Sequence, residues 1–499
     1  MYAIHRVLGT LLSILFLVWF LSAFVMMYHG FPRVNQRKQL AKQEFLREGQ
    51  SAMSLLPIDS VLTQLPPEEP VMDIALKREK GRTALQVRTF HTSYTLPVDT
   101  VTVVDTIPDL LRTVKQWCDA PIARVDTMYR LDQWIPFGSM KKELPIYKYH
   151  FADAEKHQLY IGSQSGKVLQ FTDRDERFWA WLGAIPHWVY FTRLRQDLEL
   201  WSNTVIALSG IGCIMVIAGI WVAVDVWRKS RRRKAAGFSP YRKKWYHWHY
   251  VSGIFFGIFV LTFVFSGMMS LAEIPSWISH PTLSIDPRRA FHEPKPQMEE
   301  IRLDYRLVLA AYPDAKQVEW SNFCQHPYYT VKGEDMEVYI DATDSVPRPL
   351  QLSKEEVEEA VQNIYEKEKL PYPVTLQTER LDHFETYYRD MSQMYKNVSL
   401  LPVWKITADD EDHSVYYVNP QTGAVRYVNT TARWKYWTYP ALHRMRIAGL
   451  NSNVTLRKTV LWILLLGGTV VSATGIVLSV NYLRRKFHRK KIKDKGNAV

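Results

Sequence analysis

Four long apolar segments place the strongest constraint on what this chain can fold into. They lie at residues 1–28, 201–228, 249–272 and 458–482 of a 499-residue sequence. Each contains roughly the 20 apolar residues that a helix needs to cross a hydrocarbon core of about 30 Å. The first segment is not interpreted as a signal peptide, because its apolar run is too long and no Ala-x-Ala pattern precedes Pro32. The sequence therefore predicts four transmembrane helices.

The positive charge of the chain lies mainly beside these segments. The net charge is +13, and the densest basic clusters fall in the loop 229–248 and in the C-terminal tail 483–499. Basic loops next to spanning helices mark the cytoplasmic side of a membrane. Both termini are therefore expected in the cytoplasm, and the long regions 29–200 and 273–457 outside it. Nucleic-acid binding is not favoured, because no basic soluble domain with interleaved aromatic residues is present.

Both outer regions show short helical patterns followed by alternating strand patterns. For example, SKEEVEEAVQNIYEKE at 353–368 begins with a serine that is followed three residues later by a glutamate, which predicts a capping box. It leads to a hairpin pattern with a glycine in its turn. Each outer region is expected to hold two α-β-β units, with one helix packed on a small antiparallel sheet in each. The three cysteines form no CxxC motif, so zinc and iron–sulfur sites have little support.

The chain also carries an internal duplication. The first and third apolar segments match at an offset of 244 residues, and the second and fourth match at an offset of 256. The matched residues are His5 with His249, Gly9 with Gly253, Ser22 with Ser266, His187 with His443, and Gly219 with Gly475. Both copies enter the membrane from the same side, which predicts parallel repeats about an axis along the membrane normal. The predicted fold is a four-helix transmembrane bundle of two parallel repeats, with α+β domains outside the membrane.

The duplicated histidines suggest a pair of metal-ligating sites. His5 and His249 would face each other at the cytoplasmic end of the bundle, and His187 and His443 at the outer end. Two imidazoles on opposite sides of a bundle axis suit haem, which takes axial ligands above and below its plane. The matched glycines would let a flat macrocycle approach the backbone closely. The alternative is that these are ordinary polar residues at a membrane interface.

Other residues near these positions are weaker candidates. His247 lies two residues from His249 and would point to another face of the helix, and its repeat-equivalent is Ala3. His29 is equivalent to Glu273, so it has no histidine partner either. Arg6 and Arg444, which directly follow proposed ligands, could pair with haem propionates, as could Arg193 and Arg195. Alternatively, these arginines extend their charged groups to the membrane interface.

Several motifs carry a family resemblance. They are HRVLG at 5–9, GAIPHWVYF at 183–191, WHYVSGIFFG at 248–257, FSGMMSL at 265–271 and YPALHRMRI at 439–447. Together they resemble the PepSY-associated transmembrane family, which includes iron-regulated inner-membrane proteins and ferric-siderophore reductases. The resemblance covers nearly the whole chain and implies PepSY domains between the helices. The family's b-type haem ligands would correspond to His5, His187, His249 and His443.

The resemblance implies a di-haem transmembrane oxidoreductase of the bacterial inner membrane. Such a protein would reduce ferric-siderophore or other ferric chelates on the periplasmic side for iron acquisition. Some family members carry a fused flavin and nicotinamide module, which this sequence lacks, so a cytoplasmic flavoprotein reductase or quinol is the expected electron donor. Two alternatives stay open: a non-redox PepSY binding, sensing or uptake-accessory protein, and a transporter in which the histidines bind a metal ion directly.

Overall fold

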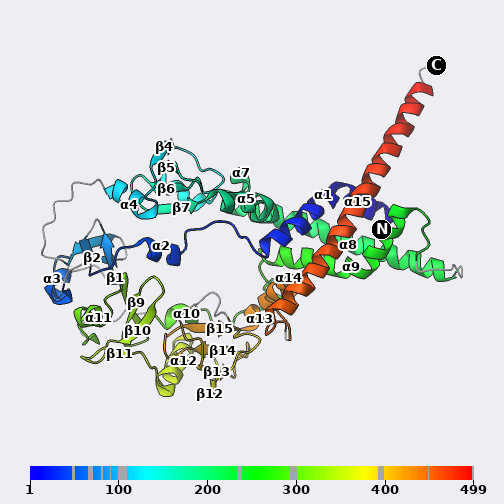
Figure 1. Ribbon diagram of the computed structural model, residues 1–499. Helices are drawn as coiled ribbons and strands as arrows, with labels where there is room; N and C mark the ends of the chain where they lie inside the picture. Colours follow the sequence, from blue (N-terminus) through cyan, green and yellow to red (C-terminus); the bar gives the residue numbers. More distant parts are fainter. Residues whose placement is uncertain are drawn as a thin grey trace. The chain divides into compact units, whose positions relative to one another are not determined.

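In the computed structural model the chain forms two compact units. Figure 1 labels the helices and strands of both. The helix unit comprises Met1–Arg33, Ala120–Pro275 and Trp434–Val499, and the sheet unit comprises Val34–Asp119 and Ser276–Arg433. The structure describes residues 1–47, 51–65, 71–79, 82–89, 92–98, 109–232, 239–292, 300–390, 398–447 and 449–496. Each unit is described by itself.

Four helices of the helix unit are long and apolar enough to cross a membrane. They are α1 (Tyr2–Met26), α8 (Leu198–Arg232), α9 (Lys244–Met269) and α15 (Val454–Gly496). Helices α1 and α9 each pack against both α8 and α15, so the four helices form one bundle (Figure 1). Leu12, Phe16, Val260 and Leu464 are among the side chains buried at its centre. The expectation of four apolar membrane helices is confirmed by these lengths and compositions.

The last helix is longer than its apolar segment. The sequence suggests a helix at 458–482 followed by a basic tail at 483–499, whereas α15 continues as a helix to Gly496. Lysine and arginine are good helix formers, so the basic run extends the helix without a break. The loop 229–248 is also shorter than expected, because α8 ends at Arg232 and α9 begins at Lys244; residues 233–238 lie outside the described part.

The helix unit also contains a sheet and several short helices. Its four-stranded antiparallel sheet has the order β4-β5-β6-β7. The strands are β4 (Ile122–Met128), β5 (Ile146–Phe151), β6 (Gln158–Gly162) and β7 (Val168–Thr172), with the 3-10 helix η2 (Gly138–Glu143) before β5. The short helices are α5 (Arg174–Leu182), α6 (Ala184–Trp188), α7 (Thr192–Arg195), α13 (Thr430–Tyr436, partly in this unit), the π-helix η4 (Trp437–Ala441) and α14 (Leu442–Arg444). Helix α6 packs on α1, and α14 packs on α9.

The sheet unit joins the two outer regions of the sequence in one sheet. This antiparallel seven-stranded sheet has the order β11-β10-β9-β8-β1-β2-β3. Its strands are β1 (Val71–Glu79), β2 (Arg82–Thr89), β3 (Ser93–Pro97), β8 (Gln317–Phe323), β9 (His326–Lys332), β10 (Glu337–Asp341) and β11 (Arg348–Pro349). The sheet unit also contains the short helices α2 (Gln36–Lys42), η1 (Ala52–Ser54), α3 (Ile58–Leu62), α4 (Asp109–Trp117), α10 (Pro287–Ala290) and α11 (Tyr305–Ala311).

This shared sheet differs from the expectation of two separate α-β-β units in each outer region. Strand β1 pairs with β8, which lies more than 200 residues further along the chain, with Ile74 opposite Trp320 and Leu76 opposite Val318. Each of these strands would otherwise be the edge of a hairpin with unpaired backbone groups. Pairing them satisfies both edges and buries Leu76 and Val318 completely. The strand patterns themselves were anticipated, but their partner was not.

A second sheet of the sheet unit agrees more closely with the sequence pattern. It has the order β12-β13-β14-β15, with strands β12 (Leu376–Leu381), β13 (Val403–Ala408), β14 (Val415–Val418) and β15 (Val425–Val428). Helix α12 (Lys354–Glu368) packs on β12 and β13. Ser353 and Glu356 form the predicted capping box, in which each side chain accepts a hydrogen bond from the other residue's backbone N–H. Gly423 takes a φ of +67° in the turn between β14 and β15.

Pairing of β1 with β8 can be tested by a disulfide. Cysteines placed at Ala75 and Glu319, which are direct partners in the register, should cross-link on mild oxidation. Directly opposite residues have Cβ atoms about 4.5–5.5 Å apart, close to the separation that a disulfide spans. Mass spectrometry of non-reduced peptides would detect the link.

The matched control pairs Ala75→Cys with Ser321→Cys. This position lies two residues along β8, where diagonal partners are about 7–8 Å apart. Linkage in the control pair at the same yield or higher would contradict the register.

Candidate functional site

Two histidines from different helices face each other at one end of the bundle. The rings of His5 on α1 and His249 on α9 have centroids 6.1 Å apart. Nδ1 of His5 lies 3.0 Å from the backbone oxygen of Met215, and Nδ1 of His249 lies 3.2 Å from that of Val471. His249 Nδ1 is also 3.0 Å from the hydroxyl of Thr474. Because a carbonyl oxygen only accepts, each Nδ1 carries the proton and donates, which leaves Nε2 with the free lone pair.

A second pair has the same arrangement at the other end of the bundle. His187 on α6 and His443 on α14 have ring centroids 6.1 Å apart. Nδ1 of His187 donates to the backbone oxygen of Trp19 at 3.2 Å, and Nδ1 of His443 donates to that of Phe263 at 3.2 Å. The hydroxyl oxygen of Ser22 lies 3.1 Å from Nδ1 of His187, and that of Ser266 lies 3.0 Å from Nδ1 of His443. Within the described residues, the Nε2 atoms of both rings have no hydrogen-bond partner.

The contacts of one half recur in the other half at the offsets found in the sequence. Trp19 and Phe263, which accept from His187 and His443, differ by 244 in residue number. Met215 and Val471, which accept from His5 and His249, differ by 256. Helices α6 and α14, which carry His187 and His443, each end at a residue in the left-handed conformation. These residues are Val189 with φ 54° and Met445 with φ 48°. The two copies therefore orient their histidines with the same backbone groups.

The His187–His443 pair is held in the neutral state. Burial lowers the pKa of His187 to about 4. Burial, followed by repulsion from a charged His187 and from Arg444, lowers the pKa of His443 to about 3. Both imidazoles are therefore uncharged near pH 7, and a neutral imidazole is the form that ligates a metal.

A cavity of about 750 Å³ is lined by both residues of the His5–His249 pair, and its volume is within the range of small-molecule and cofactor pockets. Its lining includes His5, His249 and the four matched glycines Gly9, Gly253, Gly219 and Gly475. Arg6, Arg485 and Lys486 also line it, together with five tyrosines: Tyr2, Tyr241, Tyr246, Tyr250 and Tyr482. Among the described residues the lining includes cations and no carboxylate, so the cavity suits a ligand with an apolar body and acidic groups.

The geometry of both pairs fits a shared metal between the two rings. Imidazole nitrogens lie about 2.0–2.1 Å from a bound metal, and the ring centre lies about 1 Å further, which gives a centroid separation of roughly 6 Å. The observed separation is 6.1 Å in both pairs. Donation from Nδ1 to a backbone carbonyl is also the usual support of a ligating histidine. The donor sets and the glycine-lined cavity therefore fit haem, the cofactor that the sequence suggests.

Four other candidates from the sequence, Arg6, Arg444, His247 and His29, each contact an aromatic side chain. Arg6 lies over the ring of Tyr482 at 5.0 Å, and Arg444 donates to the hydroxyl of Tyr439 at 3.1 Å. His247 contacts the ring of Trp248. His29 stacks on Trp179 at 4.6 Å and is not near another histidine ring in the described residues.

Some residues of the site were not identified from the sequence. The carbonyls of Met215, Val471, Trp19 and Phe263 cannot be identified from side-chain types, because every residue has one. The sequence identifies Ser22 and Ser266 as a matched pair, but it does not indicate that they contact His187 and His443. Thr474 has no such signal, since its repeat-equivalent is Ala218.

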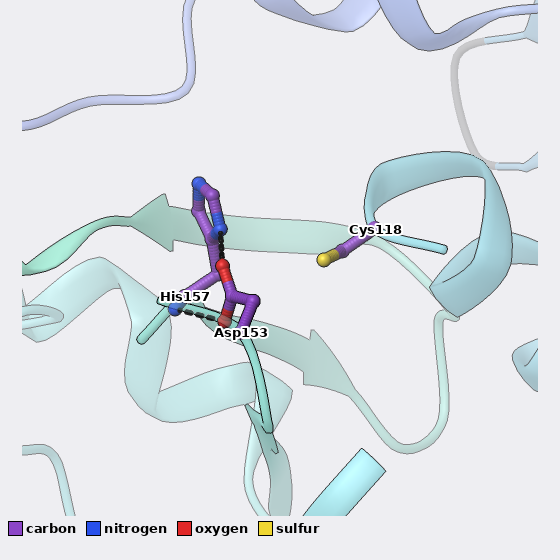
Figure 2. Close-up of side chains that lie close together, drawn as sticks. All are labelled: Cys118, Asp153 and His157. Atoms are coloured by element: carbon purple, nitrogen blue, oxygen red, sulfur yellow. Dashed lines mark hydrogen bonds and ion pairs between the residues drawn. The ribbon is translucent and has the colours of Figure 1, made fainter. Parts of the chain in front are cut away.

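A further histidine of the helix unit is paired with a carboxylate. Figure 2 shows His157 with its ring and its backbone N–H directed at Asp153. The contacts between His157 and Asp153 close the turn between β5 and β6, and the ring of His157 also stacks on Phe171 at 4.8 Å. Figure 2 also draws Cys118, which belongs to the sheet unit.

The chain matches a known protein family. A protein-family model described as "PepSY-associated TM region" matches residues 99–478. A search of the curated proteins found no match.

The close approach of Gly219 to His5 predicts an asymmetric effect of two matched substitutions. A Cβ atom at Gly219 would lie 2.6 Å from Cε1 of His5, whereas a Cβ atom at Gly475 would lie 3.5 Å from Cε1 of His249. Alanine is favoured over glycine in a helix by up to about 1 kcal/mol, so Gly475→Ala should be neutral or stabilising. Gly219→Ala should destabilise by roughly 1–3 kcal/mol, because the ring of His5 must move. Thermal unfolding in detergent would measure both effects.

A second substitution tests whether the clash is the cause. In a His5→Ala background, Gly219→Ala should no longer destabilise, because the ring is absent. An unchanged cost in that background would show that His5 does not limit the space at Gly219.

Proposed function

Since the chain belongs to the PepSY-associated transmembrane family, as its motifs predict, we propose that it is a di-haem electron-transfer protein. In this proposal α1, α8, α9 and α15 form a bundle of two parallel repeats, and each level of the bundle binds one haem b. The protein would act as a membrane oxidoreductase of the ferric reductase type.

One observation carries this proposal. His5 with His249, and His187 with His443, form two pairs with the same 6.1 Å ring separation. In all four residues Nδ1 lies within hydrogen-bond distance of a backbone carbonyl. Interfacial histidines with no ligand role have no need for such matched support. If haem is bound, two imidazoles per site would hold its iron without leaving a place for oxygen, which would favour electron transfer.

The roles of the protein's own residues follow from these contacts. The backbone acceptors fix each ring about its Cβ–Cγ bond and keep the proton on Nδ1, which leaves Nε2 as the ligand atom. The buried apolar side chains around Phe16, Val260 and Leu464 would limit the access of water between the two histidine pairs. Arg6, Arg485 and Lys486 offer cations to acidic groups at the inner cavity. Bound haem would supply one-electron redox chemistry.

The spacing of the two pairs supports transfer across the membrane. Ser22, which contacts His187, lies seventeen residues after His5 on α1, a rise of about 25 Å at 1.5 Å per residue. That rise covers most of a hydrocarbon core of about 30 Å. We propose that the protein lies in the bacterial inner membrane, with the His5–His249 pair towards the cytoplasm and the His187–His443 pair towards the periplasm. The basic residues at the end of α8 and along α15 support this orientation.

The donor and the acceptor are part of the same proposal. A cytoplasmic flavoprotein reductase or quinol would provide electrons at the inner end. A ferric siderophore or another ferric chelate would accept them at the outer end, and the ferrous ion is held more weakly by such chelates. The family resemblance supports this choice of acceptor.

The visible spectrum of the purified protein tests the proposal. Protein from haem-replete cells should show a sharp α-band after reduction with dithionite, with about two haems per chain by pyridine haemochrome assay. A colourless preparation would exclude the electron-transfer function and would favour a non-redox PepSY binding, sensing or uptake-accessory protein.

Neighbouring histidines on α9 provide a matched pair of variants. His249→Ala should lose one of the two haems, because the inner pair then has one imidazole. His247→Ala should keep both, since His247 contacts Trp248 and not His5. Haem content and the low-temperature α-bands of each variant would be measured. Loss of haem from His247→Ala with full retention in His249→Ala would overturn the assignment of ligands.

A further inference from the structure

Two arginines and a group of aromatic side chains meet in the helix unit, at the end of the bundle that holds His187. We call the residues Arg33, Arg195, Phe31, Phe137, Tyr190 and Trp201 the arginine–aromatic cluster. The guanidinium of Arg195 lies 4.4 Å from the ring centre of Trp201, 4.9 Å from that of Phe137 and 5.1 Å from that of Tyr190. Arg33 lies 5.5 Å from the ring centre of Phe137 and donates to the hydroxyl of Tyr190 at 3.5 Å.

Neither arginine is neutralised by a carboxylate among the described residues. Asp132, the acidic residue of the adjacent loop, pairs with Lys148 and accepts from Tyr160. Asp197 accepts from the backbone N–H of Leu200 at the start of α8. The Nε–H of Arg195 is buried and has no hydrogen-bond partner in the described part of the chain. Two cations within 5.5 Å of one ring centre, with a buried donor left over, form a site that favours an anion.

Cation–π packing alone explains the position of Arg195 but not the pair. A single cation would hold the aromatic side chains together, and a second one beside Phe137 adds repulsion. The other half of the bundle also does without this arrangement. At the offset of 256, Arg195 corresponds to Asn451, whose amide donates to the hydroxyl of Tyr436 at 3.4 Å. The end of the bundle can thus be built with a neutral residue at this place, and the cations belong to one half only.

The cluster is accessible and close to the outer histidine pair. Arg33 is exposed, and Phe137 and Arg195 are half-buried, so a ligand can reach the guanidinium groups and the ring. Tyr190 follows His187 by three residues, and its ring centroid lies 5.1 Å from that of Trp188. The backbone links the cluster directly to the helix that carries His187.

We propose that the arginine–aromatic cluster binds an anionic ferric chelate with aromatic oxygen donors, of the catecholate class. The guanidinium groups would donate to the negatively charged oxygens, for which their planar fork is suited. Phe137 would pack against the aromatic rings of the chelate. This inference rests on the proposed function for the fate of the chelate, whereas binding itself requires no haem.

Calorimetric titration of the full-length protein in detergent tests the proposal. The probe is a gallium(III) tricatecholate, which has the charge and shape of the ferric chelate but is not reduced. The wild-type protein should bind it, and Arg33→Gln and Arg195→Asn should each weaken binding about tenfold or more, as expected for a lost charged hydrogen bond. A gallium(III) trihydroxamate without net charge should bind weakly and should be unaffected by either substitution.

Arg193→Gln is the matched control. Arg193 is exposed on the same helix α7 and has no aromatic or carboxylate contact in the described residues, so its loss removes one charge without touching the cluster. Binding should be nearly unchanged. If all three variants lost affinity equally, general electrostatic attraction would explain the binding and the proposed site would be rejected. Absence of binding by the wild-type protein would also overturn the proposal.

Two controls separate this outcome from other failures. The thermal unfolding midpoint would show whether Arg195→Asn disturbs the aromatic packing, and Arg33→Gln, at an exposed position, tests the site without that risk. The visible spectrum reports on haem independently. If colourless protein binds the chelate, this inference holds and the electron-transfer function is rejected. If haem-containing protein does not bind the chelate, this inference is rejected and the electron-transfer function holds.

Discussion

The hydrogen bond from a histidine Nδ1 to a backbone carbonyl is the interaction on which the site depends. An imidazole at the end of a helix can rotate and can carry its proton on either nitrogen. In this protein Met215, Val471, Trp19 and Phe263 provide the acceptors, and all four belong to spanning helices. The packing of the bundle therefore decides the proton position and the direction of each ring. A shift of α1 along α8 would remove the contact of His5, and a shift of α9 along α15 would remove that of His249.

The repeated contacts also relate the two halves of the chain to each other. The same offsets of 244 and 256 residues connect the histidines, their backbone acceptors and the left-handed residues Val189 and Met445. The copies are nevertheless not identical. Thr474 supports His249 without a counterpart at Ala218, and Arg195 has Asn451 as its counterpart. The shared contacts are those that hold the histidines, and the differences lie in the surroundings.

The two ends of the bundle differ in the surroundings of their cations. The inner cavity presents Arg6, Arg485 and Lys486 without a carboxylate, whereas the cations of the arginine–aromatic cluster lie on aromatic rings at the other end. The membrane-spanning helices carry few charges in their apolar windows, which concentrates the polar chemistry at the two ends. In the proposed function, the inner end meets an electron donor and the outer end a ferric chelate.

The sequence by itself determined the four spanning helices, the capping box at Ser353, the family and the matching of His5 with His249 and of His187 with His443. Length, apolar content and repetition are local or linear properties, so they can be read without a structure. Only the tertiary structure decided that β1 pairs with β8, that Thr474 and four backbone carbonyls support the histidines, and that Arg33 and Arg195 meet at Phe137. Such contacts join residues far apart in the chain through groups that nearly every residue possesses. Their selection depends on how the helices and strands pack in three dimensions.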